Sequence, residues 1–155
     1  MYDFNNVSEV DLIPANTIAK ARLCLKPGDD PDNPFLKLSR NGGKYLDCEF
    51  VILEGEFAKR KVFHKIGIEG NEDWVKMSQR FIKNLLESAN GIAKNDKSEK
   101  AENIRKIEEL TDLDGLEVLI KIGITPEGEF QPQNKIQSVI TAESPIYQRM
   151  MSVPW

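Results

Sequence analysis

Residues 55–65, GEFAKRKVFHK, hold the side chains of this chain that are best suited to binding chemistry. The stretch carries four lysine or arginine side chains, one histidine and two phenylalanines, in a protein whose formal net charge is −4. Cations neutralise phosphate groups, and an exposed aromatic ring can stack on an unpaired base. These residue types therefore indicate either a surface for single-stranded nucleic acid or an ordinary hairpin kept soluble by its charges.

The other reactive side chains do not indicate catalysis. His64, the only histidine, is in phase with Val62 and Ile66 and is expected to pack inward. Cys24 and Cys48 lie in apolar, strand-like runs, so we expect two reduced core residues. No spacing suggests three converging metal ligands, and no phosphate-binding glycine pattern occurs. We expect no enzyme activity, no cofactor and no metal.

The composition is that of a single water-soluble domain, with 155 residues of which 40% are hydrophobic and 30% charged. The negative net charge argues against coating of duplex DNA by bulk electrostatics, but it leaves room for a local basic groove. The N-terminus shows no signal-peptide pattern, and no apolar run approaches the roughly 20 residues that span a bilayer. We expect a cytoplasmic protein with no membrane partner.

Period-two alternation of apolar residues predicts the strands that position these side chains, at residues 17–26, 45–53, 61–68, 117–125 and 135–141. Residues 27–44, rich in proline and glycine, read as a long loop. A helix is expected from Asn71 to Asn90, with Trp74, Met77 and Phe81 as a core stripe. Residues 93–110 read as a charged, partly mobile insertion with a short helix, and 142–155 as a C-terminal tail.

The order of these elements is three strands, a helix and two strands. That order predicts a mainly β (α+β) fold, a five-stranded OB-fold-like barrel with a helix between strands 3 and 4. A sandwich needs more strands, and a parallel α/β fold needs a helix after each strand. We expect one domain over residues 1–141.

Alternation on the third predicted strand divides the opening stretch between two faces. Lys61, Phe63 and Lys65 point outward if Val62 and His64 point inward. An OB-fold binds oligonucleotides over strands 2 and 3 and their flanking loops. The candidate nucleic-acid-binding residues are therefore Lys20, Arg22, Arg40, Lys44, Tyr45, Phe57, Lys59, Arg60, Lys61, Phe63 and Lys65.

An alternative interpretation of the same face stays open. Asp47 and Glu49 are expected to point outward from the second strand, between the first and third. Their carboxylates can pair with Arg22, Lys61 or Lys65 across the sheet and form an ordinary charge ladder.

The order and spacing of several motifs resemble a family of phage- and prophage-encoded OB-fold proteins regarded as single-stranded-DNA-binding proteins. The resemblance covers residues 12–141 and rests on a strand with leucine and phenylalanine, a V-x-E-G turn with a following aromatic residue, a basic R-K-V-F step and a helical Q-R step. In this chain these residues are Leu46, Phe50, Val51, Glu54, Gly55, Phe57, Arg60, Lys61, Val62, Phe63, Gln79 and Arg80. Many relatives carry glycine where this chain has Lys59.

This resemblance implies a protein that coats unwound strands during phage DNA replication or recombination, with little sequence preference, in the host cytoplasm. An accessory or adaptor protein is the alternative, binding a replication or recombination enzyme through its insertion and tail. The tail residues that suggest such docking are Tyr147, Pro154 and Trp155. A homodimer remains open.

Overall fold

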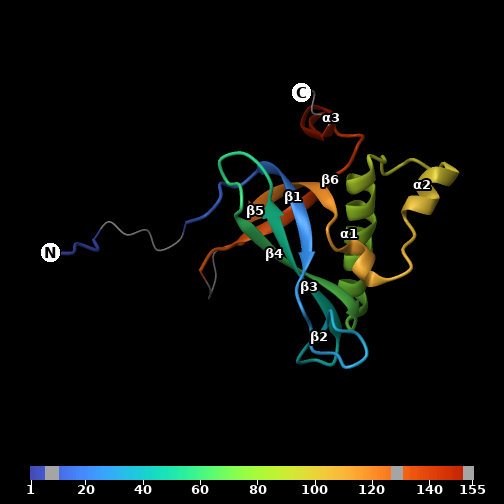
Figure 1. Cartoon of the computed structure of the whole chain (residues 1–155), viewed down its shortest axis with the longest axis horizontal. Coiled ribbons are helices and arrows are strands. Elements are labelled where there is room, and N and C mark those ends of the chain that lie inside the picture. Colours follow the sequence, from blue (N-terminus) through green and yellow to red (C-terminus); the bar gives the residue numbers. More distant parts are fainter. Residues whose placement is uncertain (6–10, 127–130, 152–155) are drawn as a thin grey trace.

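The computed structural model describes residues 1–5, 11–126 and 131–151 of the chain. It is a mainly β, α+β fold in which an antiparallel sheet of six strands packs against helix α1 (Glu72–Asn90) (Figure 1). The predicted fold class is therefore confirmed at this level. None of the helices in the described ranges has the length and apolar character needed to cross a bilayer.

The five strands expected from alternation are all present, each within one residue of its expected ends. They are β1 (Thr17–Leu25), β3 (Lys44–Ile52), β4 (Lys61–Glu69), β5 (Glu117–Ile124) and β6 (Asn134–Ile140). A sixth strand, β2 (Leu36–Leu38), lies inside the long loop and was not expected. Only Leu36 of its three residues is buried, so β2 is too short to show alternation.

The sheet is built around β1, which pairs antiparallel with both β3 and β5. Strand β3 also pairs with β2 and β4, and β5 pairs with β6. Strands β4 and β6 approach each other, but no strand pairing joins them in the part of the chain that the structure describes. The predicted closed barrel is therefore not confirmed.

Side chains of α1 pack against both β4 and β6. The ring of His64 on β4 stacks on Phe81 of α1, with ring centroids 4.1 Å apart. A hollow of about 220 Å³ lies beside them and is also lined by Ile136 of β6. Within the described residues, β4 and β6 approach each other beside the helix without the strand-to-strand hydrogen bonds that close a barrel.

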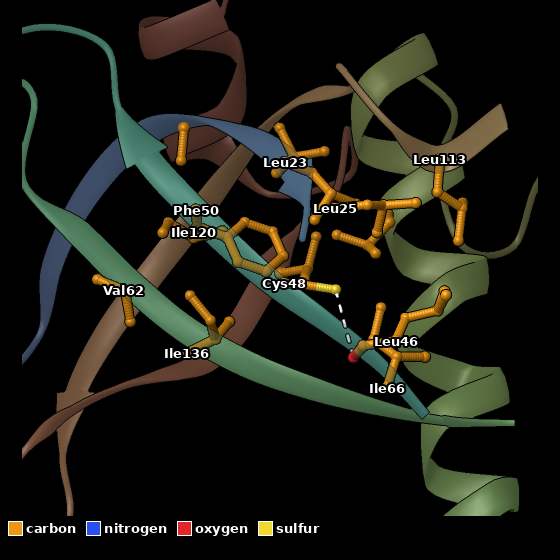
Figure 2. Close-up of a cluster of buried hydrophobic side chains, with 14 of the residues drawn as sticks. Leu23, Leu25, Leu46, Cys48, Phe50, Val62, Ile66, Leu113, Ile120 and Ile136 are labelled. Atoms are coloured by element: carbon orange, nitrogen blue, oxygen red, sulfur yellow. Dashed lines mark hydrogen bonds between the residues drawn. The ribbon is translucent and has the colours of Figure 1, made fainter. Parts of the chain in front are cut away.

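The core lies between the concave side of the sheet and α1 (Figure 2). Alternate residues of each strand point into it, and the Cys48 thiol donates a weak hydrogen bond to the carbonyl of Leu46 (3.7 Å). Burial raises the pKa of this thiol to about 12, which keeps it protonated. Cys24, also predicted as core, lies half-buried on the opposite face of β1, because it is out of phase with Leu23 and Leu25.

Helix α1 begins at an Asn71 cap, whose side chain accepts from the Trp74 backbone, and it ends at Gly91, whose φ is 68°. Its C-terminal half packs into the core through Leu85 and Leu86. The predicted core stripe is confirmed for Phe81, which packs edge-on against the buried Phe50 ring, but it is wrong for Trp74 and Met77. Met77 is 64% exposed, and Trp74 is half-buried against Gly67 of β4, outside the core cluster.

The expected charged insertion contains the short helix α2 (Glu99–Ile104) and is followed by the 3₁₀ helix η1 (Leu110–Leu113). Ala101 of α2 is fully buried. The Arg105 guanidinium donates to the buried carboxylate of Glu87 at 2.8 Å, which ties the insertion to α1.

The segment expected as a tail begins with another helix, α3 (Pro145–Met151). Tyr147 of α3 is buried, and its hydroxyl donates to the Ser88 carbonyl of α1 at 2.6 Å. Residues 145–151 therefore pack on the body of the protein, which argues against Tyr147 as a docking side chain. The other two predicted docking residues, Pro154 and Trp155, lie outside the described residues.

Candidate nucleic-acid interface

The candidate interface is the outward face of β1, β3 and β4, on the side of the sheet opposite the core. Strand β4 presents Lys61, Phe63 and Lys65 there, as alternation predicted, and the Phe63 ring is 55% exposed. Tyr45 on β3 lies half-buried on the same face. Val62 and Ile66 of the same strand are buried in the core, and the residues that alternate with them therefore point to the surface.

Two of these aromatic rings lie next to lysine ammonium groups. Lys26, which follows β1, places its Nζ 5.5 Å from the centre of the Phe63 ring. Lys65 places its Nζ 5.1 Å from the centre of the Tyr45 ring. Both distances are within the range of cation–π attraction. The face therefore combines flat rings with positive charge along β4.

Carboxylates of β3 lie among these cations, as the alternative interpretation expected. Glu49 pairs with Lys61 at 3.4 Å and lies 4.0 Å from Lys26. Asp47 pairs with Lys37 at 2.8 Å and with Lys26 at 3.8 Å. The charge ladder is therefore present in part, and it neutralises some of the positive charge of the face.

The expected ladder differs in its partners. Arg22 pairs with Glu117 of β5 at 2.8 Å and not with a carboxylate of β3. This hydrogen bond raises the pKa of the Arg22 guanidinium further. Lys65 lies opposite Asp47 in the strand register, yet no carboxylate of the described residues is within 4 Å of its Nζ. Lys65 is thus a cation that remains available to a ligand.

Three further predicted cations are engaged in pairs within the protein. Lys44 binds the buried carboxylate of Asp30 at 2.9 Å, and this hydrogen bond lowers the pKa of Asp30. Lys20 pairs with Glu54 at 3.6 Å. The Arg60 guanidinium donates to the Asp11 carbonyl at 2.5 Å, which ties the β3–β4 hairpin to the chain before β1. Their structural contacts make these lysine and arginine side chains weaker candidates for phosphate binding.

The remaining predicted residues lie in turns. Phe57 is half-buried and packs against the core, so it is not the exposed stacking ring that was expected. Arg40 and Lys59 are exposed and have no ion pair within the described residues. Lys59 adopts a φ of 74°, the left-handed conformation that favours glycine. The hairpin therefore keeps a glycine-type backbone while presenting a basic side chain.

Two hollows border the face at opposite ends of β4. The first has a volume of about 460 Å³ and is lined by Lys61, Phe63, Asp11, Leu12 and residues 131–134. The second has a volume of about 280 Å³ and is lined by Tyr45, Lys65, Trp74 and the neighbouring turns. A separate hollow of about 500 Å³ between the β1–β2 loop and η1 carries Asp32 and two glutamates, whose charge repels phosphate.

Three residues on or beside this face, Lys26, Trp74 and Asn134, were not among the predicted binding residues. Lys26 was detectable, because it continues the outward alternation of Lys20 and Arg22. Trp74 was assigned to the core, since helical periodicity cannot show that its half of α1 lies at the sheet rim. Asn134 approaches Lys61 only through the tertiary fold.

His64, which sequence reasoning expected to pack inward, does so against Phe81 of α1. Burial lowers the pKa of its imidazole. Within the described ranges, His, Cys, Asp and Glu side chains form no group of three that could hold a metal ion.

A scan of protein-family models finds no match to the chain, and a search of curated proteins finds no relative.

Proposed function

We propose that the outward face of β1, β3 and β4 binds single-stranded DNA without catalysis. The observation that carries this proposal is the Phe63 ring, which is 55% exposed on a sheet face and flanked along β4 by Lys61 and Lys65. A third ammonium group, from Lys26, lies 5.5 Å from its centre. An apolar ring exposed among cations is suited to a ligand that brings both a base and a phosphate.

A single strand fits this face better than a duplex. A ring on a sheet can stack on a base only when that base is free of its own neighbours. Duplex binding instead depends on many phosphate contacts, and the carboxylates of Asp47 and Glu49 oppose a continuous positive surface. Stacking contributes roughly 1–3 kcal/mol per base and tolerates any sequence, so we expect weak sequence preference.

The arrangement of elements supports the same proposal. The face lies on the first three long strands, a helix follows the third of them, and hollows flank the face at the strand ends. This is the region with which OB-folds bind oligonucleotides. We infer an open OB-like fold of the phage single-stranded-DNA-binding type, with a role in covering unwound strands during replication or recombination.

The decisive experiment is a fluorescence-polarisation titration with labelled single-stranded and double-stranded oligonucleotides at two salt concentrations. We expect binding to the single strand and weak binding to the duplex. Affinity for the single strand should fall as salt rises, with a slope of log K against log salt of about −0.7 for each phosphate contacted. Phe63→Leu should weaken binding by about 5- to 100-fold, the equivalent of one stacked base.

The matched control is Phe4→Leu, because the Phe4 ring is also exposed (74%) but lies on the N-terminal segment and not on the sheet. It should bind like the unmodified protein. Equal affinity of the Phe63 and Phe4 variants, or an affinity independent of salt, would overturn the proposal. Circular dichroism of each variant shows whether the fold is kept.

A further inference from the structure

The hollow of about 280 Å³ beside Lys65 contains a pair of aromatic side chains that lies apart from Phe63. The Tyr45 and Trp74 rings line it together, with centroids 6.3 Å apart and an angle of 55° between their planes. Neither ring belongs to the buried core. Two large aromatic side chains that line a surface hollow of about 280 Å³ are typical of a site for a flat ligand.

The backbone of β4 is adapted to this position of Trp74. A Cβ added to Gly67 would lie 2.5–2.8 Å from three atoms of the indole, so the ring lies directly against the strand. The strand thus supports one side of the indole, and no other residue type fits at Gly67 without moving it. A ring held in this way loses little freedom when a base stacks on it.

The polar lining of this hollow suits a nucleotide. Lys65 contributes an ammonium group that has no carboxylate partner among the described residues. Ser39, Asn41 and Asn71 contribute uncharged hydrogen-bonding groups. No Asp or Glu of the described residues lines the hollow, in contrast to the acidic hollow beside η1. The cation can neutralise a phosphate while the amides and hydroxyl bind base or sugar groups.

We propose that this hollow is a second base-binding subsite, in which a base contacts Trp74 and Tyr45 while its phosphate contacts Lys65. The proposal rests on the proposed function and gives the bound strand a path along β4, from Phe63 to Trp74. Gly67 lies four residue steps along β4 from Phe63, a distance of about 13 Å. That is about four times the rise of 3.4 Å between stacked nucleotides, so only an oligonucleotide of several residues reaches both subsites.

The test uses Trp74 as its own probe. The chain has two tryptophans, so Trp155→Phe leaves Trp74 as the single emitting indole. This full-length variant is titrated with the oligonucleotide dT12, and Trp74 emission is followed alongside polarisation of labelled dT12. We expect Trp74 emission to fall and to saturate at the same DNA concentration as polarisation, since a stacked base quenches the indole.

Substitutions then test the contribution of the ring to affinity. In the same background, Trp74→Leu should weaken dT12 binding about fivefold or more, and Trp74→Phe should retain most of the affinity, because a ring remains for stacking. Phe4→Leu is again the control, because it removes an exposed aromatic ring of the N-terminal segment that does not line the hollow. It should leave binding unchanged.

The outcomes separate this subsite from the proposed function. If dT12 binds and Phe63→Leu weakens it, while Trp74 emission stays constant and Trp74→Leu binds normally, the second subsite is overturned and the proposed function stands. If the unmodified protein does not bind dT12, the proposed function is overturned and the subsite with it. The emission measurement needs no substitution at Trp74, so it remains informative if Trp74→Leu fails to fold.

Discussion

At the scale of single residues, Glu49 decides how much positive charge the candidate interface presents. Its carboxylate lies 3.4 Å from the Lys61 ammonium and 4.0 Å from that of Lys26. Both lysines flank the Phe63 ring, on which the proposed function depends. The same carboxylate can therefore hold the lysines in place or compete with a phosphate for them.

We predict that Glu49→Gln tightens binding of single-stranded oligonucleotides about fivefold, since unit charges about 4 Å apart in water interact by about 1 kcal/mol. Fluorescence polarisation measures the change. Glu54→Gln is the control, because Glu54 pairs with Lys20 at the hairpin and not with the lysines around Phe63. If the face is only a structural charge ladder, Glu49→Gln lowers the free energy of unfolding and creates no binding.

His64 should make stability depend on pH. Burial against Phe81 lowers the pKa of its imidazole from the ordinary value of 6.5. As pH falls below 6.5, His64 therefore becomes protonated in the unfolded chain while it stays neutral in the folded protein. The free energy of unfolding is highest above that pH and should fall by about 1 kcal/mol per pH unit below it, until the lowered pKa is reached.

Chemical denaturation at pH 7.5 and pH 5.5 measures this dependence. His64→Phe keeps a ring against Phe81 and removes the titrating group, so it should lose less stability between the two pH values. Equal losses in both proteins would show that other groups cause the dependence.

At the scale of elements, the insertion after α1 is attached through one buried ion pair. The Glu87 carboxylate is fully buried, and its Oε2 accepts from Arg105 and from Lys83, each at 2.8 Å. Its Oε1 has no hydrogen-bond partner within the described residues. Arg105 also donates to the Ala93 carbonyl at 3.2 Å, so one guanidinium joins both ends of the insertion to α1.

We predict that Arg105→Met lowers the free energy of unfolding by about 3 kcal/mol, because it leaves a buried carboxylate with a single, half-exposed partner. Lys76→Met removes an exposed pair with Glu72 on the same helix and should cost less than about 0.5 kcal/mol. Urea denaturation compares the two variants. A small and equal effect would mean that the insertion is held mainly by burial of Ala101.

At the scale of the whole molecule, much of the fold was predictable, because the alternation of apolar and polar residues in each long strand indicates which of its side chains are buried. The alternation of Leu46, Cys48 and Phe50 with polar residues gives the strand, its inward face and its outward face without any knowledge of its neighbours. The helix after β4 was predictable for a similar reason, from its Asn71 cap and Gly91 stop. Strand β2 and helix α3 were not predictable, since they are short and depend on distant contacts.

Helix α3 shows this dependence clearly. Its Tyr147 hydroxyl reaches the carbonyl of Ser88, 59 residues away in the chain. The closed barrel is not confirmed for a similar reason. Element order cannot show whether β4 and β6, which approach each other, form the hydrogen bonds that close a barrel.

The sequence by itself determined which side chains of β4 face outward, because alternation is a local property of a half-buried strand. Only the tertiary structure decided which of those side chains are available to a ligand. It paired Lys61 with Glu49, placed Lys65 beside Tyr45 with no carboxylate partner among the described residues, and brought Trp74 against Gly67. The physical reason is that ion pairing and ring packing depend on distances between separate elements, and no local pattern encodes those distances.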